Sequence, residues 1–173
     1  MASFKWKLKS LPFDSEQINY HLDSDFFNEI ESTEISAACI DARVEMTRKS
    51  DSRYELSIAC TGEVTIPCDR CLADMTHKVD ATYRLSVNQE GDMLDDSNDG
   101  VLIIPESWHE LDVAPLIRDT VLLNIPLMHA HAPGECDPDM MERLKQLETS
   151  DEEPASQDVD PRWDALRKLK EEQ

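Results

Sequence analysis

The chain of 173 residues is long enough to form one domain with a buried core. It carries 37 Asp and Glu against 17 Lys and Arg, which gives a net charge of −20. Proteins whose main task is to neutralise nucleic-acid phosphates carry the opposite sign, because release of counterions from the phosphates drives that binding. The composition therefore disfavours broad contact with an RNA backbone, and it favours solubility and attraction to basic partners.

Neither insertion into a membrane nor a disulfide framework is expected. No stretch of 18 apolar residues occurs, and the first residues, Met1 to Trp6, contain no apolar signal region. Five cysteines are an odd number, which is unsuited to a closed set of disulfides. We therefore expect a cytoplasmic protein whose thiols are reduced.

The amino-terminal part predicts two strands followed by a short helix. In the first segment apolar residues alternate with lysines, which is typical of a strand with a basic outer face. The apolar residues are Phe4, Trp6 and Leu8, and the basic ones are Lys5, Lys7 and Lys9. Residues 17–22 alternate in the same way and predict a second strand, with a helix through this region as the competing interpretation. Asp23 or Ser24 then caps a short helix.

The centre of the chain predicts an antiparallel meander. Residues 40–47, 54–66 and 75–87 each alternate apolar and polar side chains, and short polar turns join them. Gly62 interrupts the longest of these segments, where we expect a bulge. Pro67-Cys68-Asp69-Arg70-Cys71-Leu72 lies between the last two segments and forms the predicted tip of a hairpin.

A helix after the meander is expected to cover its apolar face. Between positions 88 and 112 the chain has eight acidic residues and no Lys or Arg, which indicates an acidic loop around a short buried strand at 101–104. Asp112 caps the helix, and Pro115 lies in its first turn. The apolar stripe has the spacing of a helix on a sheet and comprises Val113, Leu116, Ile117 and Val121. The fold class is therefore α+β, with an antiparallel, partly closed sheet covered by a helix.

We divide the chain into three parts. Residues 1–147 form the α+β domain with the cysteine hairpin, and residues 148–159 form an acidic, disordered linker without apolar periodicity. Residues 160–173 form a C-terminal amphipathic helix that begins at Asp160-Pro161. Trp163, Leu166 and Leu169 share one face of this helical tail, and we expect them to contact the domain or a partner.

Cys68 and Cys71 are the strongest candidate site. Two cysteines three residues apart in a tight loop can direct both sulfurs to one point, as tetrahedral Zn²⁺ coordination requires. Cys136 with His129 or His131, from one later loop, would complete four ligands for a structural Zn²⁺. The alternative is a pair of reduced thiols on a hairpin. A thioredoxin-like pair is disfavoured, because such a pair opens a helix, whereas the residues after Cys71 alternate like a strand.

No catalytic constellation is evident in the sequence. It contains no glycine-rich phosphate loop, no nucleophile elbow and no paired His-Glu helix motif. An enzyme would need Cys68 or Cys71 as the nucleophile and His129 as the base. We therefore expect a protein that is not an enzyme and has no small-molecule substrate.

The Cys-Asp-Arg-Cys-Leu run at residues 68–72, between β segments and upstream of a helix, resembles the YceD family, the large ribosomal RNA accumulation proteins. The closing Asp160-Pro161-Arg162-Trp163 and the pattern Leu166-x-x-Leu169-Lys170 resemble the same family. The resemblance implies a protein needed for accumulation of large-subunit ribosomal RNA, whose family is described as predicted to bind metal and nucleic acid. Genes of similar proteins often neighbour the gene of a small basic ribosomal protein.

From the resemblance and the charge we expect a non-enzymatic ribosome-biogenesis factor. Its partners would be a basic large-subunit ribosomal protein, pre-ribosomal RNA, or both, and no membrane. One alternative is a metal- or thiol-dependent RNA-processing enzyme. Another is an RNA-binding module that uses the lysine strip, Lys5, Lys7 and Lys9, with Trp6 as a stacking neighbour.

Overall fold

The computed structural model describes residues 3–11, 14–29, 35–90, 95–98 and 100–147. The elements in chain order are β1 (Lys5–Lys7), η1 (Leu8–Ser10), β2 (Ser15–Asp23), α1 (Ser24–Glu29), β3 (Ala37–Arg48), β4 (Arg53–Pro67), β5 (Asp74–Gln89), β6 (Asp95–Asn98), β7 (Val101–Ile104), β8 (Glu110–Asp112), α2 (Ala114–Leu122) and α3 (Pro138–Leu147). The chain divides into two compact units, Met1–Asp137 and Pro138–Gln173. All elements from β1 to α2 belong to the first unit.

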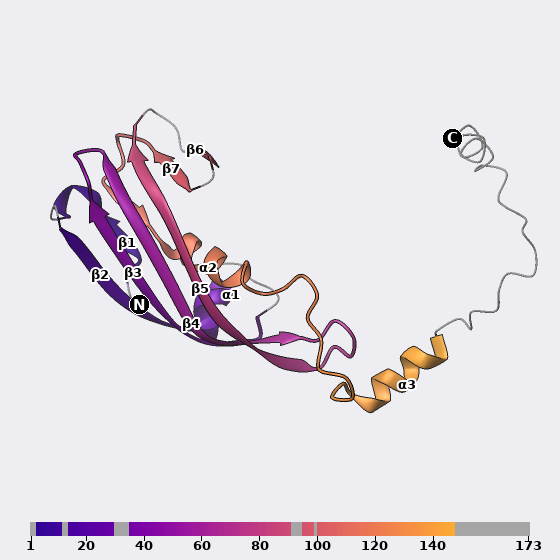
Figure 1. Cartoon of the computed structure of the whole chain (residues 1–173). Helices are drawn as coiled ribbons and strands as arrows, with labels where there is room; N and C mark the ends of the chain where they lie inside the picture. The colour runs from indigo at the N-terminus through magenta and orange to yellow at the C-terminus, as the bar shows by residue number, and fades with distance from the viewer. Residues whose placement is uncertain (1–2, 12–13, 30–34, 91–94, 99, 148–173) are drawn as a thin grey trace, which may run out of the picture. The chain divides into compact units, whose positions relative to one another are not determined.

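The main sheet of the first unit has the strand order β2-β3-β4-β5-β7-β6 among the described residues (Figure 1). β2 to β5 are antiparallel neighbours, β7 runs parallel to β5, and β6 is antiparallel to β7. The predicted antiparallel meander is confirmed. The predicted partial closure is wrong, because β2 and β6 end the sheet on opposite sides and do not pair with each other. The apolar face is covered by helices instead of being enclosed by the sheet itself.

The long strands pair without interruption, and the bulge expected at Gly62 is not present. β3 pairs with β4, and β4 with β5, in one continuous register each. Gly62 has φ +148°, and a Cβ at this position would collide with the carbonyl oxygen of Cys39 on β3. Glycine is needed here because the neighbouring backbone approaches too closely for any side chain.

One face of the sheet carries the core. Alternate residues of β3, β4 and β5 are buried on this face, where α2 lies against β4 and β5, and α1 against β2 and β3 (Figure 1). The predicted helix is present, but its N-cap residue is Val113, one position after the predicted Asp112. Asp112 Oδ1 still accepts a hydrogen bond from the backbone N–H of Ala114 at 3.0 Å. Asp23 caps α1 through a bond from the N–H of Asp25 at 3.1 Å. The first unit is thus mostly sheet with a few helices, in agreement with the α+β class.

The amino-terminal strand pairs with the segment just before α2. β1 is antiparallel to β8, with Lys5 opposite Asp112 and Lys7 opposite Glu110. Trp6 lies between the two lysines and is only 3% exposed, and its Nε1–H donates to the hydroxyl of Tyr20 at 3.1 Å. β1 therefore has the predicted basic outer face, but each of its two lysines lies across from an acid.

The second unit contains α3, in which no side chain is buried. None of the described helices combines the length and the apolar character needed to cross a membrane. The acidic linker predicted at 148–159 and the terminal helix predicted at 160–173 lie outside the described residues and stay predictions.

Candidate metal centre

The hairpin between β4 and β5 carries Cys68 and Cys71 at its tip. The backbone N–H of Cys68 donates to the carbonyl of Ala73, and that of Leu72 donates to the carbonyl of Cys68, each at 2.9 Å. The N–H of Arg70 donates to Cys68 Sγ at 3.4 Å. These bonds turn both cysteines inward, and their exposed fractions are 0% for Cys68 and 4% for Cys71.

The loop after α2 brings two further ligand types to this tip. The ligand atoms of Cys68, Cys71, His131 and Cys136 all lie within 4.8 Å of one another. His131 Nδ1 is 3.4 Å from Cys71 Sγ, and the backbone N–H of His131 donates to Cys68 Sγ at 3.4 Å. We call these four residues the cysteine cluster. Its two halves are separated by 60 residues or more in sequence, so only the fold brings them together.

Of the two histidines left open by the sequence, the structure brings His131 into the cluster and leaves His129 outside it. The Nδ1 of His129 lies 3.0 Å from the carbonyl oxygen of Pro126, and its Nε2 lies 3.6 Å from the Asp69 carboxylate. The backbone N–H of His129 donates to Asp69 Oδ2 at 2.7 Å, and the N–H of Asp69 donates to the His129 carbonyl at 2.9 Å. These two hydrogen bonds join the loop to the hairpin tip, and they place His131, two residues later, beside the sulfurs.

The backbone around the hairpin tip favours thiolates at Cys68 and Cys71, whereas burial, together with the neighbouring Cys71 and Cys68, raises the pKa of Cys136. Burial raises the pKa of Cys68, but the N–H groups of Cys71, His131 and Arg70 that face its sulfur outweigh burial, and the pKa falls to about 5. The backbone N–H of Asp137 is the main cause that lowers the pKa of Cys71. Hydrogen bonds to a charged form stabilise that form, and the thiolate is the form of cysteine that binds metal.

The number and the chemistry of the four side chains fit a metal ion. Three sulfurs and one imidazole nitrogen make up one of the common donor sets of closed, four-coordinate sites. For metal–sulfur bonds of about 2.3 Å, tetrahedral sulfurs lie about 3.8 Å apart. Ligand atoms within 4.8 Å of one another therefore need to shift by only about 1 Å to close on an ion. The cysteine cluster could hold a metal ion.

Two residues of the hairpin tip have roles that the sequence analysis did not assign. Asp69 binds the backbone of His129 and so connects the two loops. Leu72 has φ +61° with its side chain 68% exposed, a left-handed conformation that usually favours glycine. Both residues belong to the Cys-Asp-Arg-Cys-Leu run, so this motif was the signal in the sequence that could have drawn attention to them. One sequence does not show which atoms they contact.

The residues predicted to bind partners lie elsewhere. Lys5, Lys7 and Lys9 are exposed, as expected of a basic strip. Trp6 is buried and hydrogen-bonded, so the expectation that it stacks on bases beside the lysines is wrong. Trp163, Leu166 and Leu169 lie outside the described residues.

Comparison with known families relates a larger part of the chain to one family than the short motifs do. A family model described as "Large ribosomal RNA subunit accumulation protein YceD" matches residues 56–170. The match covers about two thirds of the chain, including the whole cysteine cluster. Neither a comparison with curated proteins nor one with solved structures gave a match. The resemblance seen in the sequence is confirmed, and the chain belongs to the YceD family of large ribosomal RNA subunit accumulation proteins.

Proposed function

We propose that this protein is a non-enzymatic factor in biogenesis of the large ribosomal subunit, and that it binds a basic large-subunit ribosomal protein. The family name links the chain to accumulation of large-subunit ribosomal RNA. A newly made ribosomal protein is a basic chain that binds nucleic acid indiscriminately. A holder with a net charge of −20 attracts such a chain at long range and shields it until assembly. Accumulation of the RNA is then a downstream effect.

The choice of a ribosomal protein over RNA as the partner rests mainly on what surrounds the lysine strip. Direct RNA binding through that strip needs lysines free to meet phosphates and an aromatic side chain free to stack on a base. Lys5 and Lys7 each lie opposite an acid of β8, and Trp6 is buried. These features weaken the strip as an RNA-binding surface, and they favour a protein partner that complements the acidic majority of the chain.

We assign the cysteine cluster a structural Zn²⁺, with Cys68, Cys71, His131 and Cys136 as ligands. When bound, the ion would cross-link the hairpin tip to the loop after α2. Cys68 and Cys71 are buried against the other two ligands, which supports a structural use of the thiols over attack on a substrate. If a Cys68→Ser variant that folds still supports accumulation of large-subunit ribosomal RNA, this thiol is not a catalytic nucleophile.

Direct binding measurements test the proposed partner. Individually purified large-subunit ribosomal proteins and protein-free large-subunit RNA are titrated against the protein at low and at physiological salt. We expect binding to one or a few basic ribosomal proteins, with affinity that falls as salt rises, because exposed charges are screened over about 8–10 Å. Tight binding to the RNA, with no affinity for any ribosomal protein, would overturn the proposal.

A further inference from the structure

One long edge of β5 has no neighbouring strand among the described residues. β5 runs from Asp74 to Gln89, but β7 pairs only with its last part, from Ser86 to Gln89. On the opposite edge β4 pairs with β5 along nearly its whole length. Among the described residues, no strand pairs with the edge from Asp74 to Leu85 on the β7 side, which we call the open edge.

The backbone groups on this edge can be identified from the bonds at its end. The N–H of Ser86 donates to the carbonyl of Gly100, beside β7, at 2.8 Å, whereas the N–H of Gln89 donates to Ser52, beside β4, at 2.7 Å. Successive residues of a strand direct their N–H and C=O groups to opposite sides. The backbone N–H and C=O groups of the even-numbered residues of β5 therefore face the open edge, and between Asp74 and Leu85 this set comprises Asp74, Thr76, Lys78, Asp80, Thr82 and Arg84.

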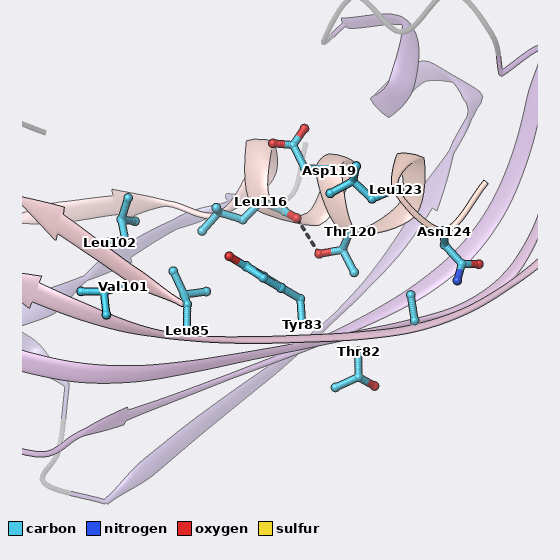
Figure 2. A pocket seen from close by; sticks show the side chains of 11 residues that line it. Thr82, Tyr83, Leu85, Val101, Leu102, Leu116, Asp119, Thr120, Leu123 and Asn124 are labelled. Carbon is cyan, nitrogen blue, oxygen red and sulfur yellow. Dashed lines mark hydrogen bonds between the residues drawn. The ribbon is translucent and has the colours of Figure 1, made fainter. Parts of the chain in front are cut away.

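An apolar groove lies directly beside this edge. It has a volume of about 420 Å³ and lies between β5, the start of β7 and α2. Tyr83 and Leu85 extend from β5 toward α2, where Leu116 lies above them, and Leu123 also lines the groove (Figure 2). Thr82 lines the groove too, although its side chain points to the other side of the sheet, so the groove reaches the strand edge itself.

An open strand edge beside an apolar groove is the arrangement used for strand addition. An extended segment pairs its backbone with the edge, and every second side chain enters the groove. We propose that the β5 edge and this groove bind an extended, basic segment of a partner protein as an additional strand, with at least one apolar side chain between Tyr83 and Leu123. The class of partner rests on the proposed function, and the inference adds the surface and the mode of binding.

The charge of the chain decides between a partner and a second copy as the occupant. Two copies would bring together two chains of net charge −20 each, which repel one another. A basic segment is attracted by the same charge. The local charges are balanced, because Asp80 shares the outer face of β5 with Lys78 and Arg84. Asp119 on the rim of the groove is paired with Arg118 at 2.7 Å, so the preference for a basic segment rests on the net charge of the chain. A basic segment with alternating apolar side chains therefore fits this surface better than another copy of the chain.

Overlapping peptides of about 12 residues, which cover all large-subunit ribosomal proteins, provide the probe. Their affinities for the full chain are compared with those for two matched pairs of variants. Leu123→Lys places a charge in the groove, and Leu127→Lys makes the same change at an exposed leucine that does not line it. Thr82→Pro removes an N–H from the open edge without removing a bond to β4, and Thr82→Val keeps that N–H.

We expect basic peptides to bind and to lose about tenfold or more in affinity with Leu123→Lys and with Thr82→Pro, but not with their controls. Hydrogen exchange gives a second readout that does not depend on the variants. On peptide binding, the amides of Asp80, Thr82 and Arg84 should gain protection, whereas Ala81 and Tyr83, whose amides already face β4, should change little.

The outcomes separate this inference from the proposed function. If ribosomal proteins bind but all four variants bind them equally, the groove inference is wrong and the proposed function stands. If no peptide binds the wild type, the inference is overturned, and binding of the full-length proteins decides the proposed function by itself. Loss of self-association in the groove variants would assign the surface to a second copy, and binding of RNA at this edge would likewise overturn the inference.

Discussion

At the scale of single residues, the two histidines of one loop have different tasks. The side chain of His131 lies among the sulfurs, whereas His129 is held by Pro126 and Asp69. The bonds between Asp69 and the backbone of His129 fix the loop, so a side chain lost at position 129 leaves those bonds in place. The two positions can therefore be distinguished by metal content.

We predict that the wild-type protein, prepared with zinc, holds one Zn²⁺ per chain, and that His131→Ala and Cys136→Ala lose it. Removal of a ligand should lower the affinity for Zn²⁺ by more than about 10- to 100-fold, which is the loss typical of removing a residue that only hydrogen-bonds to a ligand. His129→Ala should keep the stoichiometry. Elemental analysis and competition with a chromogenic chelator measure both quantities. A His129→Ala protein without metal, beside a His131→Ala protein with metal, would contradict the assignment.

The strained conformation of Leu72 gives a second prediction at this scale. A left-handed conformation costs a non-glycine residue about 1–2 kcal/mol, which a substitution by glycine would remove. Glycine is more flexible in the unfolded chain, and this flexibility cancels about 0.5–1 kcal/mol of that gain. Leu72→Gly should therefore stabilise the protein by about 0.5–1 kcal/mol in urea unfolding. Leu127→Gly is the control, because Leu127 is also exposed but has no positive φ, and it should give no gain.

At the scale of elements, β4 depends on the absence of a side chain at Gly62. Gly62→Ala would force a Cβ against the Cys39 carbonyl in a backbone conformation that alanine rarely adopts. We expect a loss of about 3 kcal/mol or more in the free energy of unfolding. Thr61→Ala, at the exposed neighbouring position, should change it by less than about 1 kcal/mol. Equal effects of the two substitutions would show that β3 can move away.

The elements that could be predicted from sequence are those whose pattern is local. Alternation identified the meander, and Asp112 with Pro115 identified the start of α2 to within one residue. Pairing between distant segments left no such signal, which is why the β1–β8 pair and the parallel β5–β7 pair went unrecognised. The prediction of a bulge at Gly62 was wrong for a related reason. A glycine within a strand is compatible with a bulge or with close approach of a neighbouring strand, and the sequence does not show which neighbour lies beside it.

The candidate site was predictable in part for a related reason. The spacing of Cys68 and Cys71 in one tight loop is local information, so it pointed to a shared position of both sulfurs. The choice between His129 and His131 depends on how two loops 60 residues apart meet, and that contact is made by Asp69. A side chain whose role is set by a distant backbone group cannot be assigned from its neighbours in sequence.

At the scale of the whole molecule, the cysteine cluster and the hydrophobic core are separate. The buried residues that form the core do not include Cys68 or Cys71, which lie beyond the ends of β4 and β5. Metal removal should therefore loosen the hairpin tip and the loop of His129 and His131 without unfolding the sheet. After treatment of the zinc-loaded protein with a chelator, amide exchange should accelerate at residues 68–72 and 129–131 and stay slow in β3 and β4. Unfolding of the whole sheet would contradict this separation.

The two halves of the cysteine cluster are far apart in sequence, so the ribosome makes Cys68 and Cys71 well before His131 and Cys136. At about 5–20 residues per second, the ribosome adds the 60 residues from Cys71 to His131 in roughly 3–12 s. The hairpin is complete only once β5 has been made at residue 89, and from then until His131 is added it presents two thiols alone. A metal ion bound there would be held by two of its four proposed ligands. Only when residue 136 has left the ribosome can the remaining two close over it. In the proposed metal-bound protein, the loop that carries His131 and Cys136 would thus close over the ion last, after the strands that present Cys68 and Cys71 have been made.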